Sequence, residues 1–108
     1  MKIEEFYNYT RLFDVYGKLL SNKQFEVMDK FLNLDIGESE LAELVGESRQ
    51  SIHDAITKAK KQLISFENKC GVLNTFEESK IKLLQAKAFL LIDSQKSADL
   101  LDDVIKNI

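Results

Sequence analysis

The sequence contains no proline and no tryptophan, and only 4 of its 108 residues are glycine. A β-sandwich needs many turns, so this composition favours an all-α fold with long helices. A single cysteine excludes an internal disulfide framework and fits a reducing cytoplasm. One histidine and one cysteine leave no metal site of known ligand spacing, and we expect neither a metal nor a cofactor.

Long apolar runs and phosphate-binding glycine loops are also absent. The longest apolar run, residues 88–92, is too short to cross a bilayer, and the charged residues 1–8 do not resemble a signal peptide. His53 and Cys70 are the only conceivable thiol–base pair, but about 25 Å of one expected helix separates them. We therefore expect a cytoplasmic protein that is not an enzyme and does not insert into membranes.

The net charge of −3 is distributed unevenly along the chain. Residues 1–47 carry five basic and ten acidic side chains, whereas residues 48–69 carry five basic and only two acidic ones. A positive segment in an otherwise acidic chain is typical of a helix that faces a polyanion. A lysine-rich face that contacts only solvent would give the same pattern.

Residues 37–66 predict two helices joined by a short turn. Ala42 within the first helix and Gly46 just after its end permit a tight helix-turn-helix. We expect Gly46 to be left-handed and Ser48 to cap the second helix. Steps of four and three residues predict the buried stripe of the second helix: Ile52, Ile56, Ala59, Leu63 and Phe66.

The rest of the chain also shows helical periodicity. Before the helix-turn-helix we expect helices over residues 3–20 and 21–34, the second begun by a capping box of Ser21 and Gln24. After it we expect a helix over residues 76–92, begun by a box at Asn74 or Thr75, a polar break at residues 93–97, and a short last helix. In the first helix of the motif, the side chains expected to face inward are Leu41, Ala42, Leu44 and Val45.

The exposed positions of the second helix are the candidates for nucleic-acid contact: Ser48, Arg49, Gln50, His53, Thr57, Lys58, Lys60 and Lys61. Gln50 and His53 are placed to reach base edges, and Arg49, Lys58 and Lys61 to reach phosphates. Arg49 is one of two arginines against thirteen lysines, which suggests a need for bidentate recognition. The alternatives are an ion pair of Arg49 with Glu47 or another neighbouring acid, and an exposed His53 without a role.

Four segments together resemble the YlxM family of small helix-turn-helix proteins: residues 12–16, 19–24, 40–43 and 46–54. The resemblance covers roughly residues 3–73. It implies an all-α fold with a DNA-binding domain similar to region four of sigma factors. It also implies a role in the signal recognition particle pathway, because family members are encoded beside the GTPase genes of that pathway.

The sequence therefore predicts a helix-turn-helix bundle of three or four helices with a long recognition helix at residues 1–70. A C-terminal helical segment at residues 71–108 packs on it or on a second chain. We expect homodimerisation through an apolar stripe that one terminal helix cannot cover: Leu63, Phe66, Leu73, Leu83 and Leu90. Two functions stay open, a DNA-binding regulator and an RNA-binding or protein-interacting modulator of the signal recognition particle and its GTPases.

Overall fold

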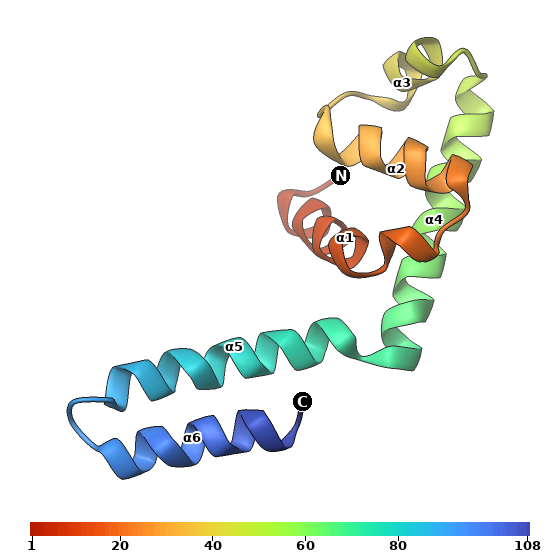
Figure 1. Ribbon diagram of the computed structural model, residues 1–108. Helices are drawn as coiled ribbons and strands as arrows, with labels where there is room; N and C mark the ends of the chain where they lie inside the picture. Colours follow the sequence, from red (N-terminus) through yellow and green to blue (C-terminus); the bar gives the residue numbers. More distant parts are fainter. The chain divides into compact units, whose positions relative to one another are not determined.

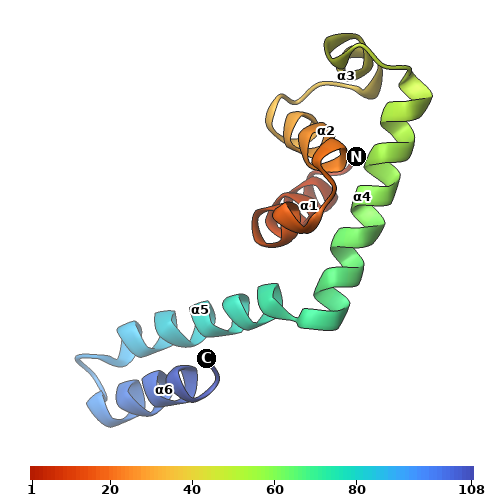
Figure 2. The same cartoon turned by 45° about the vertical axis from the view of Figure 1, so that its right-hand side comes forward.

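The computed structural model describes residues 1–108 and contains helices but no strand (Figures 1 and 2). The prediction of an all-α fold is therefore confirmed. Two compact units make up the chain, Met1–Gly71 and Val72–Ile108. The elements, in order, are α1 (Ile3–Tyr16), the 3₁₀ turn η1 (Gly17–Leu19), α2 (Asn22–Asn33), α3 (Glu38–Val45), α4 (Arg49–Cys70), α5 (Val72–Phe89) and α6 (Ser94–Lys106).

The junction between α1 and α2 follows from local sequence. The first helix stops at Tyr16 rather than at Leu20, and the chain tightens at Gly17, where an added Cβ would lie 2.9 Å from Cε2 of Phe13. Glycine is thus needed for the close approach of the Phe13 ring. The predicted capping box is confirmed, since the Gln24 N–H donates to Ser21 Oγ at 3.2 Å and the Ser21 N–H to Gln24 Oε1 at 3.3 Å.

The core of the first unit forms around α4. Both views show α1 and α2 along one side of α4, with α3 at its N-terminal end. Apolar residues of α4 at helical spacing supply the central stripe, which includes Ala55 in addition to the predicted positions. The buried side chains of α4 are Ile52, Ala55, Ile56, Ala59 and Leu63, and those of the surrounding elements include Tyr16, Val27, Met28, Leu32 and Leu41.

Two expectations about this core were wrong. Leu44 does not face inward but is 59% exposed. Leu63 and Phe66 do not require a second chain, because Leu63 is fully buried and the Phe66 ring packs against Tyr16 of α1, with 6.0 Å between ring centroids. The Tyr16 hydroxyl also donates to Glu67 Oε1 at 2.5 Å, which ties α1 to the second half of α4.

The second unit is an antiparallel hairpin of α5 and α6, which lie side by side in both views. The Ser97 hydroxyl donates to the carbonyl of Ala86 at 2.8 Å, and Lys82 forms an ion pair with Asp103. Both predicted boundaries were wrong. Helix α5 begins at Val72, so Asn74 lies inside it, and α6 begins at Ser94 because Asp93 caps it by accepting from the Lys96 N–H at 3.1 Å.

Candidate nucleic-acid interface

The turn between α3 and α4 has the geometry that the sequence predicted. Gly46 is left-handed, with φ of 73°, and the Glu47 N–H donates to the Ala42 carbonyl at 3.0 Å. Together with the 3.3 Å bond from the Gly46 N–H to the Glu43 carbonyl, this closes the C-terminus of α3 in a Schellman motif. Ser48 then caps α4, because its Oγ accepts from the Ser51 N–H at 3.1 Å.

A lysine that the sequence analysis did not select supports this turn. Lys23 of α2 lies with its Nζ 3.0 Å from Glu47 Oε1 and donates to Ser51 Oγ, also at 3.0 Å. Glu47 is therefore neutralised by Lys23, and the alternative of an Arg49–Glu47 ion pair is not what the structure contains. No local signal could have found Lys23, because it pairs across two helices.

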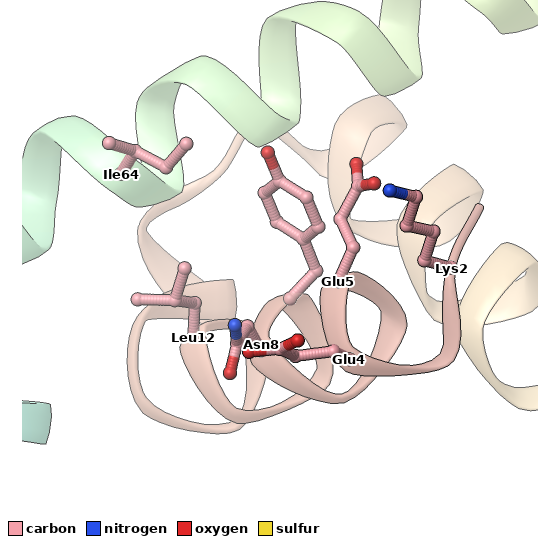
Figure 3. Close-up of a pocket in the computed structure, with 7 residues that line it drawn as sticks. Lys2, Glu4, Glu5, Asn8, Leu12 and Ile64 are labelled. Carbon is pink, nitrogen blue, oxygen red and sulfur yellow. The ribbon is translucent and has the colours of Figure 1, made fainter.

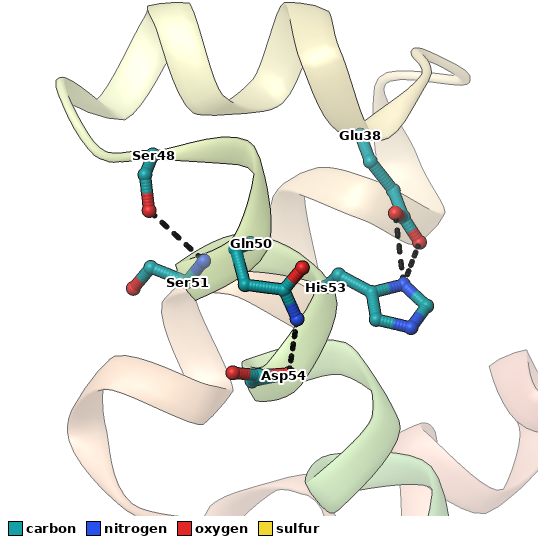
Figure 4. A network of polar contacts seen from close by, with 6 residues as sticks. All are labelled: Glu38, Ser48, Gln50, Ser51, His53 and Asp54. Atoms are coloured by element: carbon teal, nitrogen blue, oxygen red, sulfur yellow. Dashed lines mark hydrogen bonds and ion pairs between the residues drawn. The ribbon is translucent and has the colours of Figure 1, made fainter.

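Polar side chains at the start of α4 are held by specific partners (Figure 4). Gln50 Nε2 donates to Asp54 Oδ1 at 2.9 Å, which leaves the Gln50 carbonyl oxygen free. His53 Nδ1 lies 3.0 and 3.1 Å from the two carboxylate oxygens of Glu38 in α3. The contact requires the proton on Nδ1, so that Nε2 of the ring is available to another group. His53 is thus exposed but oriented.

The cationic candidates fall into two groups. Arg49, Lys58 and Lys61 are exposed and make no ion pair. Lys60, by contrast, was wrongly expected to be exposed. Its Nζ lies 4.9 Å from the centre of the Tyr9 ring and 3.9 Å from Glu5 Oε1, so it packs towards α1.

The two remaining candidates differ in exposure as well. Thr57 is half-buried, and Ser48 is exposed beside the turn. The positive charge of this surface therefore comes from Arg49, Lys58 and Lys61 and not from Lys60.

Two open hollows adjoin the start of α4. One, of about 490 Å³, lies between the N-termini of α2 and α4 and is lined by Ser21, Lys23, Gln24, Ser48, Gln50, Ser51, Asp54, Ala55 and Lys58. The other, of about 470 Å³, is lined by Glu38, Arg49, Gln50 and His53. Each hollow contains one acidic residue, Asp54 in the first and Glu38 in the second. The first also contains two lysines and the N-termini of two helices, which favour anionic oxygens, so it suits a phosphate better.

A third hollow, of about 400 Å³, lies between α1 and α4 (Figure 3). It is lined by Lys2, Glu4, Glu5, Asn8, Tyr9, Leu12 and Ile64. Burial, and then the charge of Glu5, raise the pKa of the Tyr9 phenol above its ordinary value. Its two glutamates oppose an anionic ligand, so this hollow does not extend the candidate interface.

Candidate membrane-spanning helices and metal-binding clusters are both absent from the chain. No helix combines the length and the apolar composition that are needed to span a bilayer. No group of three or more His, Cys, Asp or Glu side chains is placed to hold a metal ion.

The fold and the turn define the class as a helix-turn-helix protein. Residues 3–105 match the family described as "Putative helix-turn-helix protein, YlxM / p13 like", and the chain belongs to this family. This confirms the resemblance that the sequence motifs indicated.

Curated relatives agree with this assignment. The chain is 34% identical to a UPF0122 protein of Clostridium perfringens over 106 residues, which cover 98% of the chain and 91% of the relative. It is 32% identical to one of Clostridium acetobutylicum, covering 98% and 96%. It is also 35% identical to one of Acetivibrio thermocellus over 83 residues, covering 77% and 71%.

Proposed function

We propose that this chain is a DNA-binding regulatory protein that presents the start of α4 to the major groove. One observation carries the proposal. Arg49, Lys58 and Lys61 are exposed and without ion pairs on the helix that follows the turn of a helix-turn-helix. That is the helix whose N-terminal residues read bases in proteins of this class.

The oriented polar residues suggest how bases would be read. Asp54 fixes the amide of Gln50, so that one N–H and the carbonyl oxygen of Gln50 face outward. A glutamine amide presented in this way pairs with adenine in the major groove. His53, held by Glu38, offers Nε2 beside it. Arg49 and Lys61 then contact phosphates. Ser48 and Thr57 lie at the edge of the surface. We assign Lys60 to packing against α1.

The hollow between α2 and α4 supplies a further phosphate contact. It brings Lys23, Lys58 and the capped N-terminus of α4 to one concave surface. Lys23 also removes the charge of Glu47, the acidic residue nearest the groove-facing end. We assign Lys23 to the interface for both reasons. Asp54 opposes phosphate, so we expect modest affinity with a clear dependence on salt.

The acidic surface of α3 favours one alternative. Glu40 and Glu43 are exposed on the helix that precedes the turn, and they would repel a phosphate backbone. In that case the same fold modulates the signal recognition particle and its GTPases by binding RNA or protein. In either case we place the protein in the cytoplasmic protein-targeting pathway. We further propose that it acts as a homodimer, which would present two recognition helices to two half-sites.

Crosslinking in cells tests the proposal. The bound nucleic acid is sequenced, and co-purified proteins are identified, for the native chain and for Arg49→Ala/Lys58→Ala/Lys61→Ala. The charge-matched control is Lys2→Ala/Lys87→Ala/Lys106→Ala, which changes three exposed lysines elsewhere. We expect duplex DNA recovered with the native and control chains and largely lost with the first variant. Recovery of RNA or of targeting proteins, unchanged by the first variant, would favour the alternative.

A further inference from the structure

The α5–α6 hairpin buries very little of its own apolar surface. Its buried side chains are Ala86, Ser97 and Val104. Ala86 and Ser97 are small, and Ser97 is also polar, so Val104 is the only larger apolar side chain among them. A unit of fewer than about 40 residues rarely folds on such a core without disulfides, a metal or a partner. Part of its remaining apolar surface must therefore be covered in the functional state.

Helical spacing places several of these side chains on the same face of the hairpin. On α5, Phe76 and Leu83 are seven residues apart, and Leu90, in the turn just after the helix, continues the same seven-residue spacing; on α6, Leu101 and Ile105 are one turn apart. Because Ser97 bonds to Ala86 and Lys82 pairs with Asp103 in an antiparallel arrangement, the register puts Leu83 level with Leu101. Their exposed fractions are 59% for Phe76, 45% for Leu83, 58% for Leu90, 38% for Leu101 and 69% for Ile105.

The opposite face of the hairpin is polar and already closed. Lys82 pairs there with Asp103, and a small hollow on that side is lined by Glu78 and Asn107. The Lys96 ammonium lies 4.4 Å from the centre of the Phe89 ring on the same side. The hairpin is therefore amphipathic as a unit, with one polar face and one face that we call the apolar face: Phe76, Leu83, Leu90, Leu101 and Ile105.

The size of the apolar face fits a second copy of the same hairpin. The 18 residues of α5 extend about 27 Å, and two helices are about 20 Å wide, which gives on the order of 500 Å² in plan. Two such faces together would bury on the order of 1,000 Å², which is the lower limit for a specific protein–protein interface. Two such hairpins, packed face to face, form a four-helix bundle with a continuous core.

The first unit has no surface of this kind to offer. Its exposed large apolar side chains are spread over α1, η1, the end of α2, α3 and α4, and they include Ile3, Leu19, Leu34, Leu44 and Ile64. Scattered single residues do not match a continuous stripe. A second copy, by contrast, supplies the same residues about a two-fold axis.

We propose that two chains dimerise through their apolar faces in an isologous four-helix bundle, with Leu83 and Leu101 at its centre. The inference rests on the homodimer of the proposed function and identifies its interface. Nucleic acid takes no part in this interface. The dimer interface can therefore be disproved while DNA binding is confirmed, and DNA binding can be disproved while the interface is confirmed. The second stripe of α5, which contains Ile81 and Leu84, points away from the bundle.

Sedimentation of the full-length chain at micromolar concentration tests the interface. We expect the native chain to be a dimer, and Leu83→Glu/Leu101→Glu to sediment with half that mass and with helix content retained by circular dichroism. The matched control is Leu84→Glu, an adjacent exposed leucine on the outward stripe, which should remain dimeric. A monomeric native chain, a double variant that stays dimeric, or a control that dissociates equally would overturn the proposal.

A crosslink decides the case in which the double variant fails to fold. Residues near a two-fold axis face their own copies, so Leu83→Cys in a Cys70→Ser background should oxidise to a disulfide-linked dimer. Leu84→Cys in the same background should not. The native chain could also remain monomeric alone and form a complex only after a different protein is added. That protein would then cover the apolar face, and the proposal would be wrong.

Discussion

Lys23 of α2 and Glu47 of the turn form an ion pair, with 3.0 Å between Nζ and Oε1. The two residues are exposed, so the pair contributes little to folding, on the order of 0.5 kcal/mol. In the proposed binding mode its effect on function is larger, because Lys23 offsets a negative charge at the N-terminal end of α4 that would face the phosphate backbone.

The pair yields a prediction about affinity. Replacing Lys23 by alanine frees the charge of Glu47 and removes a cation, so duplex binding should weaken by roughly tenfold, the equivalent of about 1.4 kcal/mol. Fluorescence anisotropy at low salt measures this. Lys23→Ala/Glu47→Gln should recover part of the loss, whereas no recovery would show that Lys23 acts without reference to Glu47.

Substitutions of Ser48, the N-cap of α4, should affect the stability of the fold and the affinity for duplex DNA differently. Ser48→Ala removes the acceptor for the Ser51 N–H and should lower the free energy of unfolding by about 1 kcal/mol. Ser48→Asp keeps a capping oxygen and should leave the unfolding temperature close to that of the native chain. Its negative charge should nevertheless weaken duplex binding. Thermal unfolding and anisotropy of the two variants check both halves, and equal binding by native and Ser48→Asp chains would contradict a contact near this terminus.

The turn depends on the backbone of Gly46 rather than on space around it. No atom lies within 4 Å of an added Cβ, but φ is +73°. Gly46→Ala should therefore cost about 1–2 kcal/mol, since L-residues are disfavoured in this conformation. Gly46→Asn should cost less, because asparagine tolerates it. Chemical denaturation measures the difference, and equal losses for the two would point to a cause other than the backbone.

The hairpin should be sensitive to acid. Lys82 donates a hydrogen bond to Asp103, and this bond, with the attraction between the charges, lowers the pKa of the Asp103 carboxyl. A carboxylate whose pKa is lower in the folded state stabilises the fold above its unfolded pKa, and that stability is lost as the pH falls through the folded pKa. The same hydrogen bond raises the pKa of Lys82, so the contribution is also lost at high pH.

Circular dichroism across the acid range tests this dependence. Asp103→Asn should be less stable at neutral pH and should lose less helix on acidification than the native chain. Asp102→Asn, an adjacent exposed carboxylate, is the control and should titrate like the native chain. Identical acid profiles for Asp103→Asn and the native chain would contradict the role of the pair.

Local features of the fold could be predicted from the sequence because their causes lie within a few residues. Gly46, Ser48 and the Ser21–Gln24 box are examples. The Gln50–Asp54 bond was not predicted, but its four-residue spacing on one helix is a local signal of the same kind. Periodicity placed Ile52 and Ile56 in the core for the same reason.

Contacts between distant segments could not be predicted in this way. Lys60 packs towards Tyr9, and His53 is held by Glu38, because tertiary packing brings α1 and α3 to α4. A single sequence contains no signal for such pairs. Similarly, residues 93–97 were predicted to form a polar break because all five side chains are polar, whereas the Ser97 hydroxyl is satisfied inside the hairpin by the Ala86 carbonyl.

The salt dependence of duplex binding tests the central proposal most directly. Each phosphate contact contributes a slope of about −0.9 to log K against log salt concentration. The native chain should show a steep slope, which becomes shallower by about two to three such contacts in Arg49→Ala/Lys58→Ala/Lys61→Ala. The control Lys2→Ala/Lys87→Ala/Lys106→Ala should keep the native slope. Equal slopes for all three chains, or no duplex binding by the native chain at low salt, would contradict the assignment of α4 as a DNA-contacting helix.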